Sequence, residues 1–519
     1  MAIAVGMSFA LKSLVTIAFR WWLLGHATRL EAEAATDLMR RYVLAPFWVH
    51  RQRELSVIHR NISSAVAQAF NQVVLGLIGV IADVLTLLAI GLVLFVVSPL
   101  TTTFAIVLFS LLGWLVQRAL KARHTQVGRA IAQADLDAWT ALMPGLNGFR
   151  EARLSSSAEL FVGRFGKAKN ERAYASRLSS LVSEVPKYIL EIGFVVGIAG
   201  MAIVLFATET PEAALSILGV FAAAATRLLP TLNRVVATVG VIRAGRIGLG
   251  ILAREVEALD SAGYHSEART SDESFSGDLE LDAVTYRYHD SESYVLHGIS
   301  TTLTKGRTTA FVGSSGAGKS TLLDIILGLL EPTSGSVRCG GRNITDDLPS
   351  WYRGLGVVPQ DVYLLDDSVL NNITFGQPAD EVDSARLSEA IALAELTSLI
   401  ADMPEGLDTR LGERGVRLSG GQRQRIGIAR ALYRRPDILI LDEATSSLDN
   451  ATERRISDTI ESLSGSMTII LVAHRLSTVK NADKVVFLSH GRIEAEGTFD
   501  EVQHKSVEFA DLVALGKLG

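Results

Sequence analysis

The chain has 519 residues, a formal net charge of −5 and one cysteine; 48% of its residues are hydrophobic and 20% are charged. This length leaves room for at least two domains, and the negative charge gives no indication of a nucleic-acid partner. A single cysteine, Cys339, excludes an intrachain disulfide, and no cluster of cysteine and histidine has metal-ligand spacing.

Long apolar runs are concentrated before about residue 245. Each comes near the ~20 apolar residues that a helix needs to cross a bilayer. They predict five membrane spans, at about residues 1–22, 73–97, 101–118, 184–206 and 212–240.

The distribution of lysine and arginine predicts the orientation of these spans. The connections at residues 98–100 and 207–213 carry neither residue type, whereas residues 29–60 are rich in arginine and residues 118–187 carry many residues of both types. Basic stretches stay on the cytoplasmic side, so the two short connections are expected to face outward. The basic stretches are expected to extend the membrane helices into the cytoplasm, and each reverses direction once, near residues 45–47 and 144–148.

Two carboxylates, Asp83 and Glu191, fall within apolar runs. Charges inside a membrane are costly and face a cavity or a partner, so both are candidates for a polar wall of a substrate pathway. The alternative is that both lie near the cytoplasmic ends of their helices, solvated or paired. For Glu191, with Lys187 one turn earlier, we favour this alternative.

A glycine-rich segment at residues 313–321 fits the phosphate-binding pattern G-x-x-x-x-G-K-[ST]. It follows a predicted strand at residues 309–312 and leads into a predicted helix at residues 321–330. Its backbone N–H groups and the helix N-terminus attract phosphate. Lys319 is expected to neutralise the β- and γ-phosphates of ATP, and Ser320 to bind Mg²⁺. The residues expected around the phosphates are Gly313, Ser314, Ser315, Gly316, Ala317, Gly318, Lys319, Ser320 and Thr321.

Two later apolar runs, at residues 438–441 and 467–473, predict strands buried in a sheet. Asp442 directly follows the first run and is expected to hold Mg²⁺, while Glu443 is expected to orient and deprotonate the attacking water. His474 follows the second run, where a neutral imidazole is expected to sense the γ-phosphate. A doubly wound sheet places ligands at the carboxyl ends of its strands, which favours a functional role for these side chains.

Residues 418–422, with the sequence Leu-Ser-Gly-Gly-Gln, form a second candidate anion site. Ser419 is a suitable N-cap for a predicted helix running to about Arg434, and the glycines expose backbone N–H groups. One nucleotide cannot easily use both anion sites, so the second is expected to serve ATP bound by a partner chain.

These segments strongly resemble the ABC transporter superfamily, and the resemblance covers the chain from residue 1 to about 515. The resemblance implies that Tyr288 stacks on adenine, that Gln360 links Mg²⁺ to the membrane domain and that His474 is the switch histidine. It also implies that each ATP is shared between two subunits. The residues that would bind the ATP of the partner subunit are Ser419, Gly420, Gly421, Gln422 and Asp449.

The resulting expectation is a multi-domain fold. An all-α transmembrane helical domain of the ABC exporter type is expected at residues 1–255, a linker at residues 256–275 and an α/β P-loop ATPase domain at residues 276–519. Exporters of this family carry six helices in each half, so five predicted spans imply that the first helix is missing from the start of this chain.

The predicted function is an ATP-hydrolysing exporter or flippase, working as a dimer of two half-transporters, most simply a homodimer, in a bacterial cytoplasmic (inner) membrane. Residues 186–191 and 227–234 are similar to the branch that flips lipid-linked oligosaccharides. A drug, peptide or general lipid exporter on the same scaffold is the alternative. A soluble ABC ATPase would lack the spans, and a non-catalytic subunit would be expected to lack Glu443 or Ser419.

Overall fold

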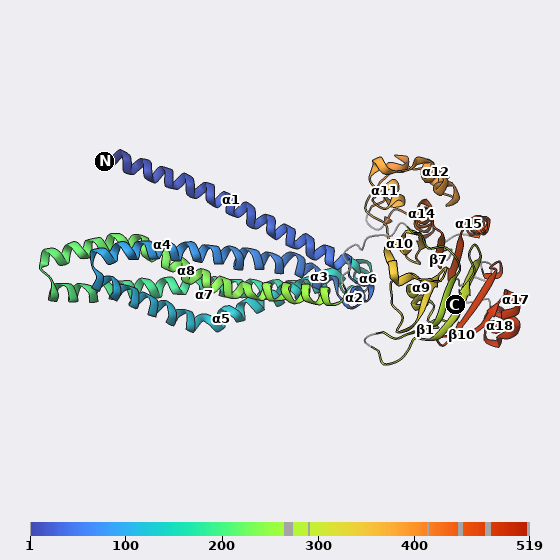
Figure 1. Cartoon of the computed structure of the whole chain (residues 1–519), viewed down its shortest axis with the longest axis horizontal. Helices are drawn as coiled ribbons and strands as arrows, with labels where there is room; N and C mark the ends of the chain where they lie inside the picture. The colour runs from blue at the N-terminus through green and yellow to red at the C-terminus, as the bar shows by residue number, and fades with distance from the viewer. Residues whose placement is uncertain are drawn as a thin grey trace. The chain divides into compact units, whose positions relative to one another are not determined.

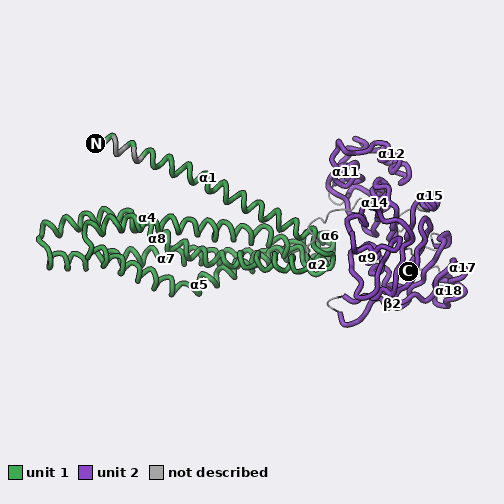
Figure 2. Tube along the Cα trace, viewed as in Figure 1, with its two compact units in different colours: residues 1–265 green, residues 266–519 purple. Residues whose placement is uncertain are grey.

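The computed structural model describes residues 2–263, 273–288, 291–412, 415–444, 450–472 and 479–515. The chain divides into two compact units, residues 1–265 and residues 266–519 (Figure 2). Each unit has its own apolar core, and they are described separately below.

The first unit is built from long helices and short helical segments that connect them (Figure 1). They are α1 (Ala2–Val43), α2 (Phe47–Gln52), α3 (Leu55–His59), the π-helical segments η1 (Arg60–Ala65) and η2 (Gln68–Val74), α4 (Leu75–Val97), α5 (Pro99–Asn147), α6 (Phe149–Leu154), α7 (Ala158–Thr208) and α8 (Pro211–Ser261).

Within the described residues, four helical stretches are long and apolar enough to cross a membrane. They contain the last four predicted spans and run through Leu55–Val97, Pro99–Asn147, Ala158–Thr208 and Pro211–Ser261. The first predicted span lies in α1, several of whose first side chains lie outside the described part, so it stays a prediction. These helices are far longer than their apolar segments, which agrees with the predicted extensions.

Helices α4, α5, α7 and α8 lie side by side, and α1 separates from them toward its N-terminus (Figure 1). Small residues allow the closest approaches. A Cβ atom added at Gly128 of α5 would lie 2.7 Å from the backbone oxygen of Ala244 in α8. The C-terminal part of α1 packs against α8 through Leu38, Tyr42 and Leu259, which are nearly inaccessible to solvent.

The reversal after α5 falls within the expected range 144–148, whereas α8 extends further than the sequence suggests. Pro144 lies inside α5, which continues to Asn147 before the chain reverses at α6. Helix α8 runs to Ser261, past residue 256 where we placed the start of the linker. Proline lacks an N–H donor and crowds the carbonyl four residues earlier, but Pro144 lies close to the end of α5, where only three helical residues follow it.

The second unit contains two sheets flanked by helices (Figure 1). Its strands are β1 (Leu279–Tyr286), β2 (Leu296–Leu303), β3 (Thr308–Val312), β4 (Ser334–Cys339), β5 (Arg342–Asn343), β6 (Leu355–Val358), β7 (Ile438–Asp442), β8 (Thr468–Val472), β9 (Lys484–Ser489) and β10 (Arg492–Gly497). A four-stranded antiparallel sheet has the order β2-β1-β4-β5, and a six-stranded sheet has the order β10-β9-β3-β8-β7-β6.

The helices of this unit connect or cover the strands. They are α9 (Lys319–Ile326), the 3-10 turn η3 (Ile344–Asp347), α10 (Leu348–Arg353), α11 (Val369–Thr374), η4 (Ala379–Glu381), α12 (Ser384–Leu393), α13 (Thr397–Ala401), η5 (Gly406–Asp408), α14 (Gly420–Tyr433), α15 (Asn450–Leu463), α17 (Phe499–Lys505) and α18 (Val507–Ala514).

The six-stranded sheet is parallel except for its edge strand β10. All five residues of β3 and of β8, and the first four of β7, are buried, as expected for strands covered on both faces. Because the strands are parallel, the segments that leave β3, β6, β7 and β8 emerge at one edge. That edge carries the residues considered next.

Candidate functional site

The glycine-rich loop joins β3 to α9 in the strand–loop–helix order that the motif requires. Gly313 has a φ of 157°, and a Cβ atom on it would collide with the backbone oxygen of Leu488 in the neighbouring strand β9. Gly318, with a φ of 100°, directly precedes α9. Helix α9 begins at Lys319 and ends at Ile326, so it starts before and stops short of the predicted range.

Lys319 is buried at the start of α9, with 8% of its surface exposed. Its ammonium group donates hydrogen bonds to the carbonyl oxygens of Gly313 at 2.5 Å and Ser314 at 3.1 Å, which folds the side chain back over the loop. Burial lowers the pKa of Lys319, and the nearby carboxylates of Glu443 and Asp442 oppose that shift. A buried cation beside a glycine-rich loop at the start of a helix fits a phosphate ligand.

The structure brings Gln360 and Glu443 together. Gln360 follows β6, Glu443 follows β7, and these two strands are parallel neighbours. The amide Nε2 of Gln360 donates a hydrogen bond to Oε2 of Glu443 at 2.8 Å. Glu443 has a φ of 51°, which is uncommon for a residue other than glycine, and its N–H donates to the carbonyl of Val472 at the end of β8. Conformations of this kind are concentrated at functional sites.

Residues 418–422 form the helix start that the sequence predicts. Ser419 is the N-cap of α14, and it shares a reciprocal capping box with Gln422: Ser419 Oγ accepts from the Gln422 N–H at 3.2 Å, and the Ser419 N–H donates to Gln422 Oε1 at 2.8 Å. Among the described residues, no hydrogen bond joins this segment to the phosphate loop at residues 313–321.

Gln424 is a site residue that the sequence analysis missed. It is 2% exposed, and its amide Nε2 donates to the backbone oxygen of Glu443 at 3.4 Å. The contact joins α14 to the segment after β7, whose residues are close only in the folded chain. No motif or spacing in the sequence predicts this contact between Gln424 and Glu443.

Tyr288 is half-buried after β1, and its hydroxyl lies 2.9 Å from the hydroxyl of Thr321 in α9. Its ring packs edge-on against Tyr286 with a centroid distance of 5.0 Å. The aromatic side chain is therefore anchored next to the helix that follows the phosphate loop. His474 and Asp449, which we also predicted as site residues, lie outside the described residues.

Comparison with known proteins agrees with this arrangement. A family model described as "ABC transporter" matches residues 296–446. The heterocyst differentiation ATP-binding protein HepA of Nostoc sp. is 35% identical over 430 residues, which cover 82% of this chain and 69% of that protein. The chain belongs to the ABC transporter family.

Two further similarities show that this ABC transporter is of the exporter type. An ATP-dependent lipid A-core flippase of Ralstonia nicotianae is 32% identical over 463 residues, covering 86% of this chain and 76% of the flippase. The structure of a bacterial Atm1-family ABC exporter with ATP bound has a TM-score of 0.82 and 26% identity, and the match covers 94% of this chain and 85% of that one.

Several predictions are thereby confirmed. The transporter has the half-transporter layout, a helical membrane domain and one α/β ATPase domain in a single chain. It is a multi-pass membrane protein that uses ATP, and its ATPase activity is coupled to export.

The transporter also carries charged residues within its spans. Asp83 of α4 accepts two hydrogen bonds from the guanidinium of Arg234 in α8, at 2.8 and 3.2 Å. The side chain of Asp83 is 18% exposed and that of Arg234 is 59% exposed. Lys187 lies over the ring of Tyr188 at 5.6 Å, and among the described residues it makes no ion pair with Glu191. The favoured interpretation, in which Glu191 is solvated or paired near the cytoplasmic end of its helix, stays a prediction.

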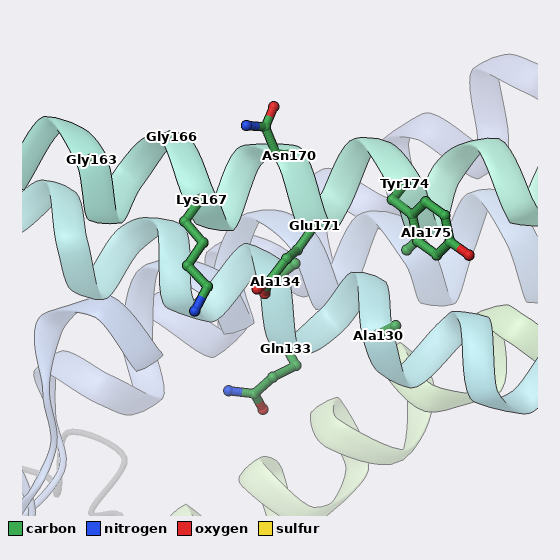
Figure 3. A pocket seen from close by; sticks show the side chains of 10 residues that line it. All are labelled: Ala130, Gln133, Ala134, Gly163, Gly166, Lys167, Asn170, Glu171, Tyr174 and Ala175. Atoms are coloured by element: carbon green, nitrogen blue, oxygen red, sulfur yellow. The ribbon is translucent and has the colours of Figure 1, made fainter.

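Two of the hollows in the membrane unit differ in polarity. An apolar cavity of about 510 Å³ lies among α4, α5, α7 and α8, and includes Leu88, Phe109, Phe194 and Leu229 in its lining. An open groove of about 900 Å³ follows α5 and α7 beyond their apolar segments. There, Lys167 and Glu171 extend from α7 toward α5, while Asn170 points away (Figure 3). The unit therefore offers one apolar and one polar hollow.

Proposed function

We propose that this chain is one half of a dimeric exporter in the cytoplasmic membrane that moves an amphipathic, lipid-linked substrate. In this proposal residues 1–255 are the transmembrane domain, residues 276–519 are the ATPase domain, and residues 256–275 link them. The observation that carries the ATPase part is the hydrogen bond between Gln360 and Glu443 beside the buried Lys319.

The nucleotide site combines three tasks. Lys319 and the backbone of the phosphate loop neutralise and orient the phosphates. Glu443, held by Gln360, takes a proton from the attacking water. Ser320, Gln360 and Asp442 offer the oxygen ligands that Mg²⁺ prefers, and Mg²⁺ there would neutralise charge on the phosphates. Among the described residues no group of three or more His, Cys, Asp or Glu side chains is placed to hold a metal ion, which suits an ion held largely by phosphates and water.

A second copy completes the site in this proposal. Ser419 and its neighbouring glycines present backbone N–H groups at the start of α14, yet no hydrogen bond links them to the phosphate loop of the same chain within the described residues. ATP contacting residues 418–422 of a second subunit would favour the closed dimer by binding energy. Loss of the γ-phosphate after hydrolysis would allow the closed dimer to open.

The amphipathic substrate is supported by the membrane unit and by the flippase relative. The Asp83–Arg234 pair places polar groups within apolar spans, and the apolar cavity lies among the same four helices. A charge in that position faces a cavity or a partner rather than lipid. Glu191 is a further candidate for this pathway. A drug, peptide or general lipid exporter is the second candidate.

Replacing Glu443 by glutamine tests the nucleotide site. We expect Glu443→Gln to bind ATP with unchanged affinity and to hydrolyse it about 100-fold more slowly or worse, because general bases contribute about 10²–10⁴-fold. Glu461→Gln, an exposed position of α15, is the matched control. Native mass spectrometry of the Glu443→Gln variant with ATP should give a dimer. Normal hydrolysis, or a monomer holding ATP, would contradict the proposal.

The substrate class is tested in proteoliposomes. ATPase stimulation and transbilayer movement are measured with polyprenyl-linked sugars, phospholipids and hydrophobic drugs in parallel. We expect the lipid-linked compounds to be moved. Stimulation by drugs alone would replace the flippase proposal with the multidrug alternative and leave the ATPase assignment intact.

A further inference from the structure

A largely buried polar network joins four elements of the membrane unit at one end of the helical bundle. Tyr42 of α1 donates a hydrogen bond to Oε1 of Glu255 in α8 at 2.9 Å and accepts one from the amide of Asn61 in η1 at 3.0 Å. Arg53, the C-cap of α2, forms an ion pair with the same Glu255 oxygen. Donor and acceptor roles are matched, since a tyrosine hydroxyl offers one proton and its lone pairs.

This network is enclosed by apolar packing. Tyr42 is 2% exposed, and the side chains of Arg53 and Glu255 are 21% and 16% exposed. The guanidinium of Arg53 also lies 5.8 Å from the centre of the Tyr42 ring. Tyr42 belongs to a small apolar core with the buried residues Leu38, Ala45, Val49, Val66 and Leu259. An ion pair between Arg41 and Asp260 adds a second tie between α1 and α8.

The position of the network in the chain gives it a mechanical consequence. Helix α8 ends at Ser261, and the chain then continues into the ATPase unit, which begins at residue 266. Helix α2 forms the turn that connects α1 to the helical stretch leading into α4. The network therefore bonds the end of α8, which continues into the ATPase unit, to the turn that joins α1 and α4.

Apolar contacts are not directional, so by themselves they would allow the end of α8 and the α2 turn to shift relative to each other. Hydrogen bonds and ion pairs in a poorly solvated environment fix one register, and leaving one partner unpaired there is costly. A polar connection at this point keeps the end of α8 and the α2 turn in a single arrangement.

We propose that Tyr42, Arg53 and Glu255 are positioning residues that make the end of α8 and the α2 turn move as one body, so that ATP-driven movement reaches α1, α4 and α8 together. The inference rests on the proposed dimeric exporter function. None of the three residues belongs to the nucleotide site.

The test measures movement at the far end of the bundle in the full-length transporter. A spin label is attached through Glu209→Cys, an exposed position after α7. The native Cys339 is 3% exposed, which leaves the introduced cysteine as the accessible thiol. Label-to-label distances between subunits are measured in nanodiscs by pulsed electron paramagnetic resonance, without nucleotide and with ATP and vanadate. ATPase activity and thermal stability are measured on the same samples.

Glu255→Gln and Tyr42→Phe are compared with Glu257→Gln, an exposed position on the same helix whose side chain makes no ion pair among the described residues. We expect both network variants to retain at least half of the ATPase rate but less than half of the ATP-dependent distance change, and the control to match the reference protein. Combining Arg53→Glu with Glu255→Arg re-forms the ion pair but not the hydrogen bond donated by Tyr42, so it should restore part of the change. Tyr42→Phe removes one oxygen atom, so it keeps the test available if Glu255→Gln folds poorly.

The outcomes separate the two proposals. An unchanged distance response in Glu255→Gln and Tyr42→Phe would overturn the positioning role. Loss of the response together with an equal loss of ATPase activity and stability would also overturn it, by showing a structural role only. No ATP-dependent distance change in the reference protein would instead refute the proposed dimeric exporter cycle.

Discussion

Replacing Gly128 by alanine tests the close approach of α5 and α8. A Cβ atom at this position would lie 2.7 Å from the backbone oxygen of Ala244 and 3.0 Å from its Cα atom. Both are backbone atoms of a long helix, so the overlap can be relieved only by moving the helices apart. Gly250 of α8 is the matched control, because a Cβ atom there meets no other atom within 4 Å.

The two substitutions should change stability in opposite directions. Alanine in place of glycine within a helix stabilises by about 0.5–1 kcal/mol. Overpacking costs about 1–3 kcal/mol, and the rigid backbone obstacle at Gly128 favours the upper part of that range. The net expectation for Gly128→Ala is a loss of about 2 kcal/mol in the membrane unit, and for Gly250→Ala a small gain.

Differential scanning fluorimetry of the purified transporter in detergent measures these effects. For a unit of this size about 1 kcal/mol shifts the melting temperature by roughly 2–4 °C, so Gly128→Ala should lower it by about 4–8 °C. ATP binding by the second unit should be unchanged, since the substitution lies in the first. A melting temperature for Gly128→Ala equal to or above that of Gly250→Ala would refute the predicted contact between the helices.

Three further predictions address other sites. Asp83→Asn should lower the melting temperature by leaving Arg234 without its counter-ion, and adding Arg234→Gln should restore most of it, because removing both members of an ion pair costs less than removing one. Gln360→Ala should lower the ATPase kcat about tenfold by releasing Glu443, which steady-state kinetics can measure. Burial raises the pKa of Cys339 to about 11, so alkylation at pH 8 should be about a hundredfold slower in the folded protein than in urea.

The nucleotide-site elements were predictable where the pattern is local. The strand, loop and helix around residues 313–321 and the buried strand before Asp442 follow from apolar runs that end at glycine or carboxylate residues. The N-cap at Ser419 was also predictable, since a capping box has a fixed spacing within one segment.

Contacts between distant segments were not predictable in the same way. Gln360 and Glu443 meet because β6 and β7 are neighbours, yet the sheet order interposes β8 between β3 and β7 in a way that no local pattern encodes. The partner of Asp83 is equally distant in sequence. Opposite charges in two apolar spans were a usable signal for pairing Asp83 with Arg234, but they could not identify the α4–α8 packing that brings the two together.

In the membrane unit, the presence of long helices was easier to predict than the π-helical segments within them. Apolar length and basic flanks identify a long helix, but they are insensitive to the hydrogen-bond pattern inside it. The π-helical segments Arg60–Ala65 and Gln68–Val74 lie where α8 presents Gly245 and Gly248 to Gln72 and Gln68. This packing depends on contacts between helices that are distant in the sequence. The small residues Gly245 and Gly248 are the part of it that the sequence of α8 shows.

Glu443 is bonded to two segments that are distant in the sequence. Its unusual backbone conformation directs it toward Gln360 after β6, while its backbone oxygen accepts a hydrogen bond from Gln424 in α14. The helix that begins at the Ser419 cap is thus bonded to the same residue that the proposed chemistry uses. If α14 moves when residues 418–422 bind ATP on a second subunit, the buried amide of Gln424 would transmit that movement to Glu443. In the proposed function, this contact would connect the helix that meets the partner's ATP to the residue that acts as the base.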